Sequence, residues 1–516
     1  MANAAELTKL VTLIEENLRA SPSAGLPFVD SRQHRERLIS RQNHVVFGRR
    51  GAGKTSLVRA IRETDDCINI YLNLEDYKDI TFPNIVIHVL VETLMQLSAV
   101  IRRHSGSLWH FRLTNKKLYK ELQDMVQQLK NLVHEPDCET QEILVTERQH
   151  QKIGASARSA GLQASGLKES HANREVKREV PKQKMAYLRL QLTEYKRLIG
   201  SASQVLHGKP IFLVLDDFYF MPKDNQPDFI DYFHRLTKGT VLFLKVATIK
   251  HRSKLYRRRG DQSTGVESGH DVFEIDMDYS LDDFEELKTF MNKILMEAIH
   301  LSKAELVIDD LFAGDGFAEM CLASGGVPRD FLSLFVALAN DVARRGQQIG
   351  KVQVREAAVR RIGNKLDSVK KDSGDEEAIL INCLAQLKRH VYKTKKTNCF
   401  LVAKDDIDAD PKGRQAIREL TDLRLIHLVD HNTSHAPTDG RVYEAYIIDV
   451  GLYETARPRG FKEISPGYRD EKARRDDLRA SPVFPLAELF SDESSGISVT
   501  NTEDKTHYDQ LQLSYE

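Results

Sequence analysis

The sequence predicts an α/β protein with a parallel sheet at its core, a helical lid, a helical insertion and a C-terminal winged-helix domain. Three observations lead to this prediction. Short apolar runs alternate with segments of helical spacing, one run enters a glycine-rich loop that leads into a helix, and the pattern becomes entirely helical after residue 280 before strand-like runs return. Strands buried on both faces of a parallel sheet have continuous apolar sequences, which is the character of these runs.

The chain is long enough for several domains and carries no overall charge. It has 516 residues, of which 41% are hydrophobic, and its 75 Lys and Arg residues balance 75 Asp and Glu residues. Chains of this length normally contain more than one domain. A net charge of zero gives no whole-chain indication of a nucleic-acid or membrane partner, so such a partner has to be argued from local patches.

Cysteine spacing and hydropathy argue against several classes of protein. The five cysteines stand singly and form no CxxC pair, which argues against a zinc site or a disulfide framework. No apolar run approaches the roughly 20 residues that a membrane-spanning helix needs, and the N-terminus lacks the basic and apolar regions of a secretory signal. We therefore expect a soluble, cytoplasmic protein with no membrane partner.

Five short apolar runs are the expected strands of the sheet. Segments of helical spacing lie between them, and strands joined through helices run parallel. The runs occupy residues 44–47, 67–72, 211–215, 241–247 and 272–275.

A long polar stretch, residues 102–206, interrupts this pattern and is predicted to be an insertion into the sheet domain. Within it, residues 115–133 and 182–206 have helical spacing. Between them lies a polar section in which residues 154–166 are mostly small, and this section is either a flexible loop or a hairpin.

These patterns divide the chain into five parts. Leucines at helical spacing predict a helical N-terminal segment, the strands define the core, and the helical pattern after them defines the lid. A helix, a short strand, a second helix and two longer strands predict the winged-helix domain, and the end of the chain lacks a pattern and is expected to be disordered. The expected boundaries are residues 1–40, 41–280, 281–366, 367–460 and 461–516.

The glycine-rich loop after the first strand fits the pattern GxxxxGK[ST]. Glycines let the backbone approach a ligand closely and let successive amides point at phosphate oxygens, and the helix N-terminus adds partial positive charge. Lys54 is expected to reach the β- and γ-phosphates of ATP, and Thr55 to bind Mg²⁺. The predicted nucleotide-binding residues of this loop are Gly48, Arg49, Arg50, Gly51, Ala52, Gly53, Lys54, Thr55 and Ser56.

Two aspartates follow the apolar run 211–215 and resemble the end of a Walker B strand. Ligands of open parallel sheets bind at the carboxyl ends of the strands, where these carboxylates would lie. Asp216 is predicted to hold Mg²⁺, directly or through water, and Asp217 to act as the general base for the attacking water. Many ATPases have Glu at the second position. Because Asp is one methylene shorter, we expect slow hydrolysis, or a residue that only senses the nucleotide.

The strand over residues 241–247 runs directly into Thr248. In additional-strand P-loop proteins, a polar side chain at this place orients the lytic water. Thr248 is therefore a predicted catalytic residue, and a simple strand cap is the alternative.

The segment Ser-Gly-Gly-Val-Pro-Arg-Asp at residues 324–330 opens a helix of the predicted lid. Two glycines permit a tight turn, and proline suits the first turn of a helix. Arg329 would then project towards the nucleotide, where its planar fork of donors suits a phosphate oxygen. The alternative is a helix cap with a surface arginine.

Together these motifs resemble the AAA+ and STAND branch of the P-loop ATPases. The GGVPR segment resembles the second sensor motif of the origin-recognition and replication-initiator clade, which implies that Arg329 touches the γ-phosphate from the lid. The same segment, with Leu-Asp-Asp-Phe at residues 215–218, also resembles signalling STAND ATPases, in which the proline, here Pro328, lies by the adenine. The resemblance covers roughly residues 28–345 without the insertion. Bacterial initiator-like ATPases, some of them found in anti-phage defence loci, are the nearest likeness.

AAA+ rings often complete each site with an arginine of the neighbouring subunit. A run of arginines lies between the fourth and fifth expected strands, where that residue usually occurs. A solvated basic loop is the alternative, and the sequence does not single out one arginine. The candidates are Arg252, Arg257, Arg258 and Arg259.

The predicted winged helix carries both basic and acidic residues. Its recognition helix is expected at residues 413–423, where Arg414 and Arg418 lie one turn apart and could contact the phosphates of duplex DNA. Glu419, Asp422 and the aspartates before this helix oppose such binding. A winged helix that binds protein, or that only couples to the lid, is the alternative.

Two main hypotheses follow for the function. In the first, the protein is an AAA+-like switch that binds and hydrolyses ATP with Mg²⁺, and its nucleotide state controls assembly on DNA, with protein partners or with copies of itself. In the second, it is a STAND-type signalling ATPase or scaffold with little turnover and no DNA binding. A third and weaker hypothesis is the ATPase subunit of an anti-phage defence complex.

Overall fold

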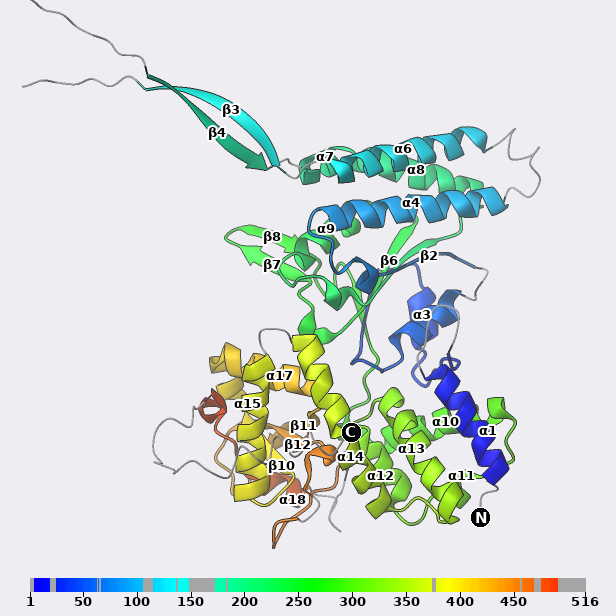
Figure 1. Ribbon diagram of the computed structural model, residues 1–516, viewed down its shortest axis with the longest axis vertical. Helices are drawn as coiled ribbons and strands as arrows, with labels where there is room; N and C mark the ends of the chain where they lie inside the picture. Colours follow the sequence, from blue (N-terminus) through cyan, green and yellow to red (C-terminus); the bar gives the residue numbers. More distant parts are fainter. Residues whose placement is uncertain are drawn as a thin grey trace, which may run out of the picture.

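A five-stranded parallel sheet lies at the centre of the molecule (Figure 1). Its strands have the order β2-β5-β6-β1-β9. The computed structural model describes residues 4–18, 25–62, 64, 66–104, 115–135, 138–147, 172–181, 184–373, 377–454, 457–467 and 475–490. The sheet confirms the predicted α/β fold, and each strand lies within one residue of its predicted bounds. The strands are β1 (His44–Phe47), β2 (Ile68–Asn73), β5 (Ile211–Asp216), β6 (Leu242–Thr248) and β9 (Phe273–Asp276).

Side chains of the strands alternate between two apolar cores, one on each face of the sheet. Leu213 and Leu215 of β5 belong to one core, and Phe212 and Val214 belong to the other. Successive residues of a strand point to opposite faces, so a strand that is apolar at every position needs helices on both sides. The first core is covered by α4 (Asn84–His104), α6 (Lys116–His134), α8 (Leu192–Val205) and α9 (Gln226–Thr237), and the second by α2 (His34–Ile39) and α3 (Lys54–Arg62).

Two helices of the predicted insertion belong to the core of the sheet domain. α6 and α8 bury Leu122, Leu129, Tyr195 and Leu198 in the same core as α4, and Figure 1 shows these helices stacked on one another. All of residues 102–206 were predicted to be an insertion into the sheet domain. Two of its helices pack into the core of that domain, and the insertion itself stays a prediction. The charged residues of these helices face outward while an apolar stripe at helical spacing packs inward.

Two strands in the middle of the insertion pair with each other. β3 (Cys138–Glu147) pairs antiparallel with β4 (Ala172–Pro181), and a short helix, α7 (Lys184–Leu190), leads back to α8. Residues 154–166, for which a loop or a hairpin was predicted, lie outside the described residues.

Helix α4 is long and apolar enough to cross a membrane, which corrects the expectation that no run has this character. It has 21 residues and a mean hydropathy of 1.7 in its most apolar window. In the structure, 61% of that window is buried, because the helix lies between the sheet and α6. Burial of this kind is typical of a core helix.

The lid is helical, as predicted, and the N-terminal helix packs on it. α1 (Ala4–Asn17) buries Leu7, Leu10 and Ile14 against the lid, beside α10 and α13. The lid helices are α10 (Phe284–Ser302), α11 (Ile308–Leu311), α12 (Gly316–Ala323), α13 (Pro328–Arg345) and α14 (Lys351–Ser373).

The C-terminal module contains its elements in the order that the sequence predicts. Three antiparallel strands in the order β10-β12-β11 pack against helices, and their apolar residues join those of the lid in a single core. Its identity as a winged helix stays a prediction. The elements are α15 (Glu377–Lys388), η6 (Arg389–Thr394), β10 (Cys399–Ala403), α16 (Lys404–Ala409), α17 (Pro411–Asp422), β11 (Ile426–Ser434), β12 (Val442–Ile448) and η7 (Val450–Leu452).

Part of the expected disordered tail is folded onto this module. Leu401 exchanges backbone hydrogen bonds with the tail, accepting from the amide of Phe484 at 2.8 Å. Leu486 and Leu489, both in η8 (Leu486–Phe490), are buried in the apolar core. These are scattered apolar residues in an irregular segment, so neither helical nor strand periodicity reveals them. Residues 491–516 lie outside the described residues.

The C-terminal module docks on the sheet domain through α17, the predicted recognition helix. α17 packs beside η3 (Lys250–Arg252), and Lys223 Nζ lies 3.1 Å from Glu419 Oε1 across this contact. The arginines predicted to meet DNA have partners inside the module. Arg418 donates to Glu444 at 2.7 Å, and Arg414 donates to the carbonyl of Ile407 at 3.0 Å.

Asp422 is a buried carboxyl at the end of α17. Burial and then the neighbouring Asp278 raise the pKa of Asp422 to about 7. A carboxyl whose folded pKa exceeds its unfolded pKa stabilises the fold at low pH and loses this contribution as pH rises through the folded pKa. We expect Asp422→Asn to raise the stability at pH 8 by about 1–3 kcal/mol, with little effect at pH 5.

Thermal unfolding of wild type and Asp422→Asn at pH 5 and pH 8 checks this expectation. Asp408→Asn is the control, because Asp408 is an exposed carboxylate of the same module. Equal pH dependence in wild type and Asp422→Asn would contradict it.

Candidate functional site

The glycine-rich loop connects β1 to α3 at the carboxyl edge of the sheet. The amide of Gly48 donates to the carbonyl of Thr248 at 3.2 Å, which ties the loop to the adjacent strand β6. Gly51 and Gly53 have φ angles of 90° and 96°, which only glycine adopts readily. The loop therefore turns directly into the N-terminus of α3, which is the geometry that binds phosphate.

A cavity of about 940 Å³ lies over this loop, between the sheet domain and the lid. Residues from the sheet domain, the lid, the N-terminal segment and the C-terminal module all line it. Of the predicted site residues, those that line it are Arg50, Gly51, Ala52, Gly53, Lys54, Thr55, Ser56, Asp216, Asp217, Pro328 and Arg329.

The acidic floor of the cavity is organised around Asp216. Its Oδ2 accepts hydrogen bonds from Thr55 Oγ1 at 2.9 Å and from the Tyr71 hydroxyl at 3.1 Å. Asp217 follows in the left-handed region, with a φ of 53°, and its amide donates to Asp216 Oδ1. Burial and then the charge of Asp216 raise the pKa of Asp217 to about 7, against the attraction of Lys54.

Lys54 is buried beneath the loop. Its ammonium group donates to the carbonyls of Gly48 at 2.8 Å and Arg49 at 3.2 Å. Burial lowers its pKa, while Asp217 and Asp216 oppose that shift. An anion above the loop would favour the charged form of this lysine further.

Arg329 reaches the cavity from the lid. Its amide donates to the carbonyl of Gly51 at 3.3 Å, so the first turn of α13 rests on the loop. Burial and then the nearby Arg50 lower the pKa of Arg329. Within the part of the chain that the structure describes, its guanidinium has no hydrogen-bond or ion-pair partner. A half-buried cation without a partner is the feature that an anionic ligand would satisfy.

Gly51 is the point where lid and loop meet most closely. A Cβ at this position would lie 2.9 Å from Arg329 Cβ and 3.0 Å from Val327 Cγ1, and its φ is unfavourable for other residues. We expect Gly51→Ala to push the lid from the loop and to weaken ATP binding about tenfold or more.

Titration calorimetry with ATP measures this effect. Gly200→Ala in α8 is the matched control, because nothing lies within 4 Å of its added Cβ. ATP affinity unchanged in Gly51→Ala would show that the lid does not close on the ligand as this contact implies.

Part of the cavity wall is apolar. It is formed by side chains of the N-terminal segment, α10 and α13, and it is suited to a flat base rather than to phosphate. No sequence motif marks this wall, because apolar residues from three distant segments form it. They are Leu18, Leu26, Pro27, Phe28, Val29, Phe290, Ile294 and Leu332.

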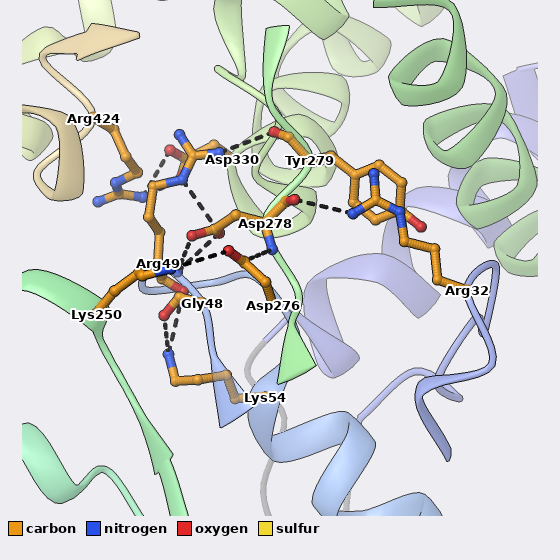
Figure 2. A network of polar contacts seen from close by, with 10 residues as sticks. All are labelled: Arg32, Gly48, Arg49, Lys54, Lys250, Asp276, Asp278, Tyr279, Asp330 and Arg424. Atoms are coloured by element: carbon orange, nitrogen blue, oxygen red, sulfur yellow. Dashed lines mark hydrogen bonds and ion pairs between the residues drawn. The ribbon is translucent and has the colours of Figure 1, made fainter. Parts of the chain in front are cut away.

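Three predicted residues, Gly48, Arg49 and Thr248, do not line the cavity. Thr248 is fully buried, and its hydroxyl forms a hydrogen bond with Ser253 Oγ. Arg49 turns away from the loop, pairs with Asp278 and donates to the carbonyl of Tyr279 at 3.2 Å (Figure 2). The position of Thr248 favours the alternative of a strand end that supports the loop.

The arginines considered for action on a neighbouring subunit lie on or near a hairpin that the sequence analysis treated as a loop. β7 (Tyr256–Arg259) pairs with β8 (Gln262–Gly265). Arg257 donates to Asp228 at 2.6 Å, and Arg258 donates to the carbonyl of Gly260 at 3.2 Å. Their role towards another subunit stays a prediction.

Several lining residues were missed because they belong to no short motif. Tyr71, Asn73 and Glu75 come from the end of β2 and the turn after it, while Arg361 and Lys365 come from α14. The adjacency of β2 to β5 is what brings the first group to the acidic pair, and sequence spacing alone does not reveal it.

The chemistry of the acidic end fits Mg²⁺ held together with a nucleotide. Its donors are the oxygens of Thr55, Asp216 and Asp217, which suit a hard cation. Among the described residues, no group of three or more His, Cys, Asp and Glu side chains could hold a metal ion by itself. Mg²⁺ in phosphate sites is typically bound by one or two carboxylates plus the substrate phosphates.

Comparisons with known proteins give only distant likenesses. No protein-family model matches the chain, and no curated protein matches it. Among solved structures, Drosophila ORC bound to DNA is similar at 13% identity and a TM-score of 0.34, with 86% of this chain and 89% of that chain covered. The Aeropyrum pernix ORC1 protein in complex with DNA is similar at 13% identity and a TM-score of 0.30, with 87% and 90% covered.

A Walker-type ATPase of Pyrococcus abyssi is also similar, at 12% identity and a TM-score of 0.35, with 87% of this chain and 93% of that chain covered. At these identities and TM-scores, the likenesses do not place the chain in a family. The geometry of the cavity therefore carries the functional interpretation: the chain has a parallel α/β sheet whose glycine-rich loop, acidic strand end and lid arginine meet in one cavity.

Proposed function

We propose that this protein is a Mg²⁺-dependent, ATP-binding switch that hydrolyses ATP slowly and changes the position of its lid with the nucleotide state. The single observation that supports this most is the convergence of Lys54, Asp216 and Arg329 on one cavity from three different elements. An apolar wall for a base and the glycine-rich loop for phosphates belong to the same cavity.

Each residue has a role that follows from its position. The loop amides and Lys54 would hold the phosphates, and Thr55 with Asp216 would hold Mg²⁺, which supplies positive charge at the phosphates when bound. Tyr71 and Thr55 fix the orientation of the Asp216 carboxylate through their hydrogen bonds. Asp217, which faces the same cavity, would accept the proton of the attacking water.

The lid would report the nucleotide state to the rest of the chain. Arg329 would bind the γ-phosphate, and its helix, α13, shares one apolar core with the C-terminal module. Loss of the γ-phosphate would remove the partner of Arg329 and weaken the hold of the loop on the lid. A lid motion would carry the module with it, because the two pack as one core.

In the first version of this proposal, the nucleotide state controls assembly on duplex DNA. α17 packs against the sheet domain in this structure, so DNA binding through this helix would require the module to leave its docked position. The second version is a protein scaffold with little turnover and no DNA binding. The internal partners of Arg414 and Arg418 favour the second version.

ATP hydrolysis by the full chain, with and without duplex DNA at low and moderate salt, separates the two versions. DNA-stimulated turnover that disappears in Lys54→Ala would support the DNA switch. Bound nucleotide without turnover and without a DNA mobility shift would support the scaffold. A chain that binds neither ATP nor ADP would overturn both.

A further inference from the structure

The C-terminal module contributes directly to the wall of the nucleotide cavity. Arg424, in the turn between α17 and β11, and Asp449, just after β12, both line it. They reach the same cavity as the phosphate-binding loop, although more than 350 residues of sequence separate Arg424 from that loop. The site is therefore incomplete without the docked module.

Arg424 forms a close ion pair with the residue that follows the lid arginine. Its Nη1 lies 2.7 Å from both carboxylate oxygens of Asp330 (Figure 2). The Arg424 side chain is 9% exposed and that of Asp330 is 21% exposed, so solvent screens this pair only weakly. A charge-assisted pair of this kind fixes the direction of the Asp330 carboxylate.

Asp330 is a carboxylate that could compete with a phosphate for the guanidinium of Arg329. The two residues are consecutive in the first turn of α13, and both line the cavity. A carboxylate there attracts the Arg329 guanidinium and repels phosphate. Because Asp330 is paired with Arg424, the guanidinium of Arg329 has no hydrogen-bond or ion-pair partner in the part of the chain that the structure describes.

A second contact holds the same lid turn to the same module. A Cβ on Gly325 would lie 2.1 Å from His427 Cε1, so the imidazole of His427 occupies the space that this glycine leaves open. His427 Nε2 lies 2.8 Å from Asp449 Oδ2, and Lys365 of α14 donates to that oxygen at 2.5 Å. The turn that presents Arg329 is thus fixed by β11 on one side and rests on Gly51 on the other.

We propose that Arg424 is a positioning residue that makes the nucleotide site selective for a triphosphate. By neutralising Asp330 it keeps Arg329 available for the γ-phosphate, through a contact that joins the C-terminal module to the lid. This role rests on the proposed function. It adds that breaking this contact between module and lid lowers the preference for ATP over ADP.

Titration calorimetry of the full chain with ATP and with ADP, both in MgCl₂, tests this role. Arg424→Gln should weaken ATP binding about tenfold and change ADP binding less than about twofold. The double variant Arg424→Gln with Asp330→Asn should recover ATP affinity to within about threefold of wild type, because no carboxylate remains to be neutralised. Asp330→Asn alone should keep or increase the preference for ATP.

A matched control separates this role from simple docking. Arg475 joins the same module to the chain outside the nucleotide cavity, through Asp282 at 3.1 Å and Asp430 at 2.8 Å. Arg475→Gln should leave the ratio of ATP to ADP affinity unchanged, and circular dichroism should show that every variant is folded.

Two results would overturn the role of Arg424 while leaving the proposed function intact. One is an equal loss of ATP and ADP binding in Arg424→Gln, and the other is a lower ATP preference in Asp330→Asn. If the Arg424 variants do not fold, the ratio of ATP to ADP affinity in Asp330→Asn alone tests the role. A wild-type chain that binds neither nucleotide would remove the proposed function and this role together.

Discussion

Replacing Lys54 with alanine is expected to weaken ATP binding about 100-fold, which corresponds to about 2.7 kcal/mol. Lys54 is the cation placed beneath the loop, and its ammonium group already bonds to the carbonyls of Gly48 and Arg49. Without it, the phosphates lose a charge-assisted donor in a site from which water is partly excluded. Equilibrium titration with ATP in the presence of Mg²⁺ measures the loss.

Lys117→Ala is the control for this substitution, since the Lys117 side chain is 91% exposed on α6 and far from any lining residue in sequence. It should bind ATP as the wild type does. An ATP affinity in Lys54→Ala within threefold of wild type would mean that phosphates do not bind at this loop.

Replacing Asp217 with asparagine is expected to lower ATP turnover by about 10²- to 10⁴-fold and to leave ATP binding nearly unchanged. Asparagine keeps the size and the left-handed backbone conformation of this residue but cannot accept a proton from water. The substitution separates chemistry from binding, because Lys54, Thr55 and Asp216 remain in place. Phosphate release under single-turnover conditions gives the rate.

Asp76→Asn serves as its control, because Asp76 is an exposed carboxylate close to the cavity that does not line it. Equal turnover in wild type and Asp217→Asn would show that another group, or no protein group, accepts the proton. Negligible turnover in the wild type would instead favour the STAND-type scaffold.

Local patterns predicted the parts of the structure that depend on local physics. Each strand of the main sheet is a short apolar run between helical segments, and the loop is marked by Gly51, Gly53 and Lys54 at fixed spacing. Such features are decided by neighbouring residues in the chain, so a single sequence contains them. The same applies to the turn before α13, where Gly325 and Gly326 take positive φ angles.

Features that depend on tertiary contacts could not be predicted in this way. The helices of the presumed insertion looked too charged for a core, but α4 covers their apolar stripes. Leu486 and Leu489 fold onto the C-terminal module with no periodic pattern. Arg49, a member of the loop motif, is drawn away by Asp278, which lies 229 positions further along the chain.

The same limit applies to the site. Tyr71 and Arg424 line the cavity because of strand order and module docking, and neither belongs to a motif. Thr248 stands where a catalytic side chain was expected, but its hydroxyl is hydrogen-bonded to the hydroxyl of Ser253. Motifs therefore located the site, while the arrangement of domains determined which side chains complete it.

The measurement that tests the central claim most directly is the affinity of wild type and Arg329→Ala for ATP and for ADP in the presence of Mg²⁺. If the lid senses the γ-phosphate, Arg329→Ala will lose about tenfold or more in ATP affinity and less than about twofold in ADP affinity. If both nucleotides bind to wild type and variant with the same ratio, the lid arginine does not read the γ-phosphate, and the proposed switch between sheet domain and lid is contradicted.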